Sequence, residues 1–85
     1  MKVKILYFAS LREKLGKDAE ELNLPAGVVT VAALRIHLRS LGGVYENSFS
    51  EQILLRAAIN QDMVSPTAVV KAGDEVAFFP PVTGG

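Results

Sequence analysis

The sequence predicts a mixed α+β domain in which a four-to-five-stranded sheet carries one main helix on one face. Short apolar segments that alternate between two faces stand near both ends of the chain, and one apolar stripe with helical spacing stands between them. The elements follow the order strand, short helix, strand, long helix and further strands, which is typical of α+β proteins. Because the chain has 85 residues, we expect a single domain.

The first strand is expected over residues 2–9, where successive side chains point to opposite faces. Its predicted core-facing residues are Val3, Ile5 and Tyr7. Phe8 falls on the opposite face, so we expect it to lie near solvent. We expect this strand and the last strand to lie side by side in the middle of the sheet.

A short helix and a second strand are expected next. Ser10 is the predicted N-cap of a helix that runs to Leu15, with Glu13 as its capping-box partner and Gly16 as its stop. The second strand is expected over residues 19–24 and ends in a turn that contains proline and glycine. Its predicted inward residues are Leu22 and Leu24.

The main helix is predicted to begin after Thr30, its N-cap, and to end at the Gly42–Gly43 pair. Its apolar stripe consists of Val31, Leu34, Leu38 and Leu41. Arg35 and Arg39 are assigned to the other side of the helix. His37 is the only histidine, and without a cysteine or a carboxylate cluster of metal-ligand spacing it is interpreted as a surface residue.

A polar loop is expected over residues 44–52, anchored by Tyr45 and Phe49. A third strand is expected over residues 53–59. The remaining expected segments are a turn at 60–62, a short strand at 63–64 that Pro66 stops, and a turn at 71–74 before the last strand.

Composition narrows the classes of function. The chain has no cysteine, which excludes disulfides and thiolate metal sites. It has nine Lys and Arg and nine Asp and Glu, a balance that indicates neither nucleic acid nor an anionic membrane as a partner. No apolar run approaches the ~20 residues of a membrane span, and the N-terminus lacks a signal-peptide pattern. We therefore expect a soluble, cytoplasmic protein.

The C-terminal end is predicted to leave the domain as an extended tail. The last strand, over residues 76–79, is expected to end at Phe79 because proline has no N–H to donate to a sheet ladder. The tail that follows can reach about 20 Å. It consists of Pro80, Pro81, Val82, Thr83, Gly84 and Gly85.

The α-carboxylate of Gly85 is the candidate reactive group. The two terminal glycines can thread a narrow channel because they lack a Cβ, and no side chain after Glu75 ionises. A carboxylate is a poor electrophile and needs activation, for example adenylation by ATP. Since the chain has neither a phosphate-binding loop nor the spacing of a catalytic triad, we predict that it has no active site of its own and that other proteins act on its terminus. A frayed glycine end is the alternative.

An apolar patch is expected on the face of the sheet that the main helix leaves open. Phe8 and Phe79 point to this face, and Met63 is a candidate third member. Two exposed aromatic side chains and a methionine indicate a partner-binding surface. The alternative is that these side chains pack against the loop after the helix.

Three segments of the chain resemble one known family: the opening MKVKILYFASLREKLG, the turn AINQDMVS and the ending DEVAFFPPVTGG. Over nearly its whole length the chain is similar to the small subunit of molybdopterin synthase, one of the ubiquitin-like β-grasp sulfur carriers. The resemblance implies a β-grasp domain over residues 1–79 and a Gly-Gly tail over residues 80–85.

The resemblance also implies a reaction cycle at Gly85. A partner adenylyltransferase would use ATP to convert the carboxylate to an acyl-adenylate, and a sulfur donor would turn that into a thiocarboxylate. The tail would then enter the large subunit of the synthase, in a heterotetramer, and give its sulfur to a cyclic pyranopterin precursor. In this family open-face apolar residues dock both partners, and by position these are Phe8, Met63 and Phe79. The chain itself is expected to bind no cofactor and no metal.

Three other functions stay open at this point. A thiamine-type sulfur carrier would serve a thiazole synthase, although its tail normally lacks the Phe-Phe-Pro-Pro run. A ubiquitin-like modifier would form an isopeptide bond between Gly85 and a lysine of another protein. A β-grasp interaction domain with a passive tail would use its docking surface alone.

Overall fold

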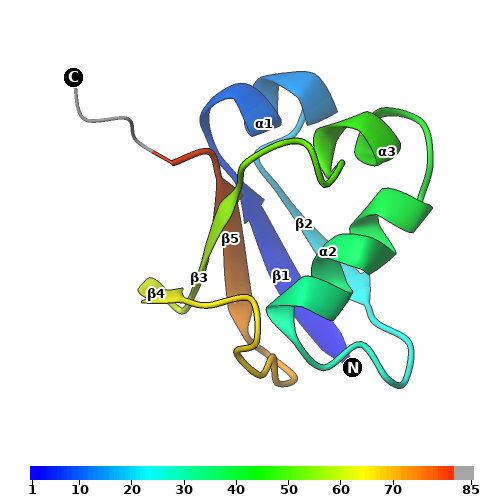
Figure 1. Ribbon diagram of the computed structural model, residues 1–85. Helices are drawn as coiled ribbons and strands as arrows, with labels where there is room; N and C mark the ends of the chain where they lie inside the picture. Colours follow the sequence, from blue (N-terminus) through cyan, green and yellow to red (C-terminus); the bar gives the residue numbers. More distant parts are fainter. Residues whose placement is uncertain (82–85) are drawn as a thin grey trace.

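A five-stranded sheet with three helices forms the part of the chain that the structure describes, residues 1–81 of a computed structural model (Figure 1). In chain order the elements are β1 (Lys2–Tyr7), α1 (Ala9–Leu15), β2 (Ala19–Asn23), α2 (Val31–Ser40), α3 (Val44–Ser48), β3 (Arg56–Ile59), β4 (Asp62–Val64) and β5 (Glu75–Phe79). The strand order is β2-β1-β5-β3-β4. Strands β1 and β5 are parallel, and the other neighbours are antiparallel. The predicted α+β class and the central pairing of the first and last strands are confirmed.

The core lies between the sheet and the helices, with α2 and α3 on the same face of the sheet (Figure 1). Its largest fully buried side chains are Tyr7, Phe49, Phe78, Ile5, Leu34, Leu38, Val3 and Val76. The predicted inward faces of the first two strands are confirmed, because Leu24 is buried and Leu22 packs against the core. Every second residue of β1 and β5 thus fills the core, and the residues between them face the open side of the sheet.

Helix α2 begins and ends where the sequence predicts. The Thr30 hydroxyl accepts a hydrogen bond from the Ala33 amide at 3.1 Å, which satisfies one of the free amides of the first turn. Gly42 and Gly43 follow the helix with φ angles of 77° and 56°, in the left-handed region that favours glycine. These glycines let the chain turn directly after α2 into helix α3.

Two assignments within α2 were wrong. Leu41 is 47% exposed, because helix α2 ends at Ser40 and Leu41, its C-cap residue, lies beyond the turns that pack against the sheet. Arg35 does not belong to the solvent side. It is half-buried and donates hydrogen bonds to the backbone carbonyls of Phe49, Ser50 and Ile53. An arginine can occupy this position because its planar group satisfies several carbonyls at once.

Helix α1 does not use the predicted cap. Strand β1 ends at Tyr7, Phe8 is the N-cap residue with extended backbone, and Ser10 lies inside the helix, so the capping box is absent. Burial of Leu11 and Leu15, four residues apart, fixes which side of the helix faces the core. The predicted stop is confirmed, because Gly16 has a φ of 73°.

The prediction of an irregular loop over residues 44–52 was wrong in part, because Val44–Ser48 forms helix α3. Tyr45 and Phe49 are four residues apart and stack on each other at 6.5 Å between ring centroids. The predicted anchoring by these two rings is confirmed, since Phe49 is 1% exposed and Tyr45 packs against the core. Strand β3 begins at Arg56, three residues later than predicted.

The β3–β4 turn is built by two residues with positive φ, Asn60 at 50° and Gln61 at 74°. The Asn60 side chain donates to an Asp74 carboxylate oxygen at 3.0 Å and accepts from the Glu75 amide at 3.0 Å. The predicted turn thereby also holds the start of β5 in register with β3.

Strand β5 ends at Phe79, as predicted, and Pro80 and Pro81 follow it outside any strand. The predictions that concern Val82, Thr83, Gly84 and Gly85 lie outside the described residues, so the division into a domain and a tail stays a prediction. None of the helices within residues 1–81 has the length and apolar character needed to cross a membrane.

Candidate functional site

The place where the C-terminal segment leaves the sheet is set by two neighbouring parallel strands. Tyr7 of β1 pairs with Phe78 of β5, so Phe8 and Phe79 follow them at the same edge of the sheet. On the other side of β5, Phe79 pairs with Arg56 of β3. We call these three side chains, Phe8, Phe79 and Arg56, the tail-root row.

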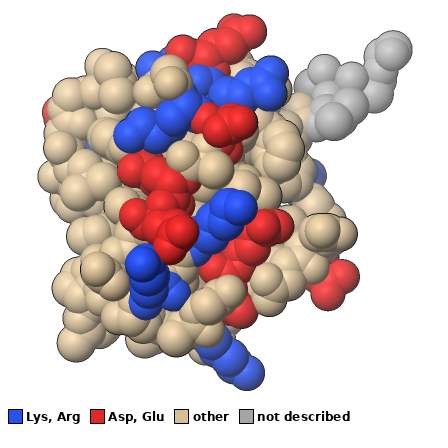
Figure 2. All heavy atoms as spheres, turned by 180° about the vertical axis from the view of Figure 1, so that it is seen from behind, with Lys and Arg blue, Asp and Glu red and all other residues tan. Residues whose placement is uncertain are grey.

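A second row crosses the open face next to the tail-root row and is entirely apolar. The strand register places its members side by side in the order Ala19, Leu6, Ala77, Ala58 and Met63. The third row is charged and contains Glu21, Lys4 and Glu75. Figure 2, which views the molecule from behind Figure 1, shows a band of mixed charges down the middle of this face with uncharged surface on both sides.

The predicted docking residues all lie on or beside the open face, but they do not form one cluster. Phe8 is 45% exposed and stands next to the partly buried Phe79. Met63, 59% exposed, lies at the far end of the apolar row, beyond Ala58 and Ala77. The sequence reasoning missed these alanines and Arg56. Only the pairing of residues 56–59 with 76–79 could have indicated them.

Aromatic packing on the opposite face holds the tail root in place. The Phe49 ring meets Phe78 edge to face at 5.5 Å and Tyr7 at 6.1 Å between centroids. These distances are typical of favourable aromatic pairs. Since Phe78 and Tyr7 directly precede Phe79 and Phe8, the same contacts fix the backbone from which the exposed pair projects.

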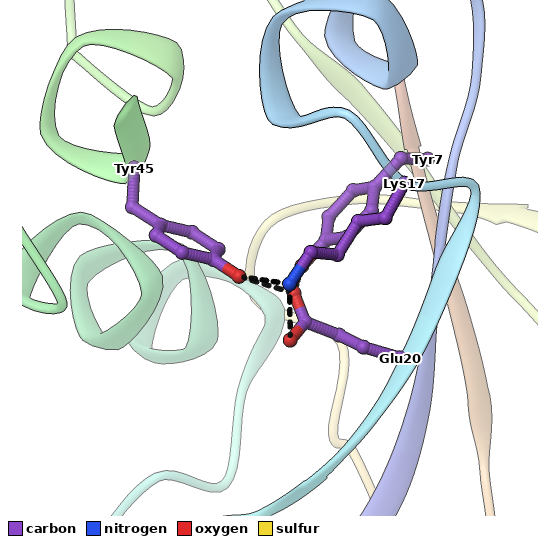
Figure 3. Close-up of polar contacts among 4 residues, drawn as sticks. All are labelled: Tyr7, Lys17, Glu20 and Tyr45. Carbon is purple, nitrogen blue, oxygen red and sulfur yellow. Dashed lines mark hydrogen bonds and ion pairs between the residues drawn. The ribbon is translucent and has the colours of Figure 1, made fainter. Parts of the chain in front are cut away.

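A polar network continues this packing toward α3 and β2 (Figure 3). One Glu20 carboxylate oxygen accepts hydrogen bonds from the hydroxyls of Tyr7 and Tyr45, each at 2.7 Å. Lys17 donates to the Tyr45 hydroxyl at 3.1 Å and forms an ion pair with the other Glu20 oxygen at 3.5 Å. The four side chains join the end of β1, strand β2 and helix α3.

The network shifts the acid–base properties of its members. Burial, followed by the hydrogen bond to Glu20, raises the pKa of Tyr7 far above its usual range, so its hydroxyl stays a donor. Burial acts to raise the pKa of Glu20, but the bonds from Tyr7, Tyr45 and Lys17 together outweigh it and lower the pKa. The hydrogen bond with Tyr45 raises the pKa of Lys17. At neutral pH Tyr7 therefore stays neutral, Glu20 negative and Lys17 positive.

The described residues offer no cluster of metal-binding side chains beside the tail root. Residues 1–81 contain no group of three His, Asp or Glu side chains that could hold a metal ion, and the chain has no cysteine. The feature that the strand pairing does build here is an apolar surface around the base of the C-terminal segment. A small α+β domain with an apolar open face beside its C-terminal segment, as in the carrier and modifier class, is what these features define.

Comparison with known sequences agrees with this class. The ThiS family matches residues 5–85. A molybdopterin synthase sulfur carrier subunit from Escherichia coli (strain K12) is 46% identical over 98% of this chain and 99% of its own length. The corresponding subunit from Haemophilus influenzae is 43% identical over 95% and 96%. The chain belongs to the ThiS family, among the molybdopterin synthase sulfur carrier subunits.

Solved structures place the fold among ubiquitin-like β-grasp proteins. A Pyrococcus furiosus protein described as molybdopterin converting factor, subunit 1, is 34% identical with a TM-score of 0.79 over 96% of this chain and 99% of that one. SAMP1 from Haloferax volcanii is 22% identical with a TM-score of 0.75 over all of both chains. A chain of the Helicobacter pylori complex of molybdopterin-converting factor subunits 1 and 2 is 19% identical with a TM-score of 0.65, again over both full chains. The last two show the fold alone.

Proposed function

We propose that this chain is a sulfur carrier for molybdopterin synthesis and that the carboxylate of Gly85 is the group that carries the sulfur. The observation that carries this proposal is the 46% identity to a molybdopterin synthase sulfur carrier subunit along almost the whole of both chains. The family match extends to the last residue, Gly85. The apolar surface around the tail root supports docking of this terminus into other proteins.

The chemistry needs groups that the described part of the chain lacks. The Gly85 carboxylate attacks the α-phosphate of ATP, which releases pyrophosphate and leaves an acyl-adenylate. A sulfur nucleophile then displaces AMP and leaves a thiocarboxylate. ATP belongs to the activating enzyme, an adenylyltransferase, and this chain supplies only the carboxyl group. The thiocarboxylate gives its sulfur to the cyclic pyranopterin precursor inside the synthase large subunit.

Two partners must reach the same terminus, the activating enzyme and the large subunit. Phe8 and Phe79 stand at the base of the tail and Met63 at the end of the apolar row, so we propose that they dock both partners in turn. The relatives that are 46% and 43% identical to this chain are named as sulfur carrier subunits of molybdopterin synthase, which supports a large-subunit partner here. A heterotetramer of two small and two large subunits is the assembly that we propose.

Mass spectrometry of the intact protein tests the proposal. After incubation with the activating enzyme, ATP and a sulfur donor, one oxygen of Gly85 is replaced by sulfur, and this product supports molybdopterin formation by the large subunit. A variant with one residue added after Gly85 binds the large subunit but acquires no sulfur. Sulfur-free protein in a complete reaction contradicts the proposal.

Mass spectrometry and co-purification together separate the alternatives. A ubiquitin-like modifier leaves branched Gly-Gly adducts on lysines of other proteins, and a thiamine-type carrier co-purifies with a thiazole synthase. The likeness to SAMP1 does not favour the modifier function, because at 22% identity it reports the fold only.

A further inference from the structure

A groove of about 530 Å³ lies on the helix-bearing side of the sheet, between α2 and strands β3 and β4. Three residues with exposed large apolar side chains line it: Ile36 (59% exposed), Leu54 (73%) and, at its β4 edge, Met63 (59%), which the strand register assigns to the open face. The buried Phe78 closes its inner end. The volume falls within the ~300–1,000 Å³ typical of binding sites. Exposed apolar residues that converge on one hollow indicate a site for a partner.

The groove is fixed at both ends. Figure 1 shows α2 and α3 toward the β2 side of the sheet, with β4 at the opposite edge. At one end Arg35 bonds the carbonyls of Phe49, Ser50 and Ile53 and so holds the segment that carries Leu54. At the other end the Ala32 amide donates to the Pro66 carbonyl at 2.9 Å. The hollow is thus built into the fold and needs little rearrangement to accept a ligand.

Its rim carries an available positive charge. Arg56 lines the groove and is exposed, and within residues 1–81 it forms no ion pair. The acidic residue of the rim, Glu51, already pairs with Arg39 at 3.5 Å. A carboxylate next to an apolar side chain is therefore the complementary ligand chemistry.

The groove is continuous with the open face. Met63 ends the apolar row and also lines the groove, and Arg56 belongs to the tail-root row. Strand β4, which carries Met63, is an edge strand that pairs only with β3 in the described part of the chain. A protein seated on the tail root therefore reaches the groove around this edge, where an extended segment can pair with β4.

We propose that the groove is a second docking site for the synthase large subunit, occupied by a segment that places an apolar side chain beside a carboxylate. This inference rests on the proposed function. Binding at the groove orients the small subunit about its tail, because it adds a contact on the other side of β4.

Calorimetric titration with the purified large subunit tests the site. Leu54→Glu puts a charge into the groove, and Leu41→Glu makes the same change at an exposed position outside it. We expect Leu54→Glu to weaken binding at least about tenfold and Leu41→Glu to stay within about twofold of the unchanged protein. Arg56→Met is the second variant, with Lys71→Met as its control in a turn remote from the groove. Arg56→Met should bind more weakly and lose part of the salt dependence of the affinity.

Several outcomes overturn the inference. Equal affinities for Leu54→Glu and Leu41→Glu show that the groove stays empty, and an unchanged salt dependence in Arg56→Met shows that no carboxylate meets it. A dimer of the unchanged chain that Leu54→Glu dissociates assigns the groove to a second copy. If Leu54→Glu weakens the binding of the activating enzyme alone, the groove is assigned to that partner. If the unchanged chain binds the large subunit but the groove variants bind equally well, only this inference fails. If the unchanged chain neither binds nor acquires sulfur, the proposed function fails.

Discussion

Glu20 links three segments of the chain through one carboxylate, because it accepts from Tyr7 on β1, from Tyr45 on α3 and from Lys17 before β2. Its lowered pKa means that the folded protein favours the charged form. The corresponding stability is present above the ordinary value of 4.5 and is lost as the pH falls through the lower folded-state pKa. Acid should therefore loosen α3 from the sheet.

Glu20→Gln should lower the free energy of unfolding at pH 7 by about 1–2 kcal/mol, since hydrogen bonds to a charged acceptor become bonds to a neutral amide. Urea denaturation measures the change. The difference from the unchanged protein should shrink as the pH drops below 4.5 and vanish below the lower folded-state pKa, where the Glu20 carboxylate of the folded protein is also neutral.

Glu21→Gln on the same strand is the matched control, because Glu21 is exposed and pairs only with the exposed Lys2. It should change stability by less than about 0.5 kcal/mol, as expected of a surface ion pair. Equal losses of unfolding free energy in the two variants at pH 7 would show that Glu20 stabilises the fold no more than an exposed carboxylate does.

At the scale of the element, one turn residue of the β3–β4 hairpin adopts a backbone conformation that its residue type disfavours. Gln61 has a φ of 74°, a region that a residue with a Cβ enters only at a cost. Two-residue turns with positive φ at both positions prefer Asn-Gly, and this chain has Asn60 followed by Gln61.

Gln61→Gly should therefore stabilise the protein by about 0.5–1 kcal/mol, read as a rise in the midpoint of urea denaturation. Gln61→Ala keeps the Cβ and should give no gain. A destabilised glycine variant would mean that the flexibility gained by the unfolded chain outweighs the strain relieved in the turn.

The sequence predicted elements whose signals are local and missed those set by tertiary contacts. Thr30 and Gly16 act within one turn of their helices, so their roles could be predicted. Ser10 is a good cap by composition, but α1 begins at Ala9, directly after the end of β1, and Phe8 takes the N-cap position. Helix α3 was missed because its middle residues are polar, although the four-residue spacing of its two aromatic rings was present.

The same division applies to the site. The end of β5 and the exposure of Phe8 followed from prolines and alternation. Arg56 could not be assigned to the tail root, because that position depends on its pairing with Phe79 across 23 positions of the sequence. The three hydrogen bonds that Arg35 donates likewise depend on carbonyls supplied by a distant segment.

At the scale of the whole molecule, enlarging a residue of the tail should impair sulfur transfer without changing the stability of the domain. Gly84→Ala adds a Cβ, which would crowd the narrow partner channel that we propose the tail enters. We expect loss of most sulfur transfer in a synthase turnover assay, with thermal unfolding unchanged. Unaltered turnover would contradict threading of the terminus through such a channel.

Docking and threading should separate experimentally, because the tail-root row lies at the end of the sheet, whereas the group that we propose carries the sulfur is the Gly85 carboxylate. Phe79→Ala should weaken binding of the large subunit by about 1–3 kcal/mol, the loss typical of a buried aromatic anchor. Val44→Ala is the control, since Val44 is 51% exposed on α3, which packs on the face of the sheet opposite Phe79. In binding titrations Phe79→Ala should reduce affinity while saturating large subunit restores turnover, because the Gly85 carboxylate is intact. If Phe79→Ala binds normally but does not support turnover, Phe79 positions the tail and does not contribute to docking. If both binding and turnover are normal, the exposed aromatic pair contributes to neither.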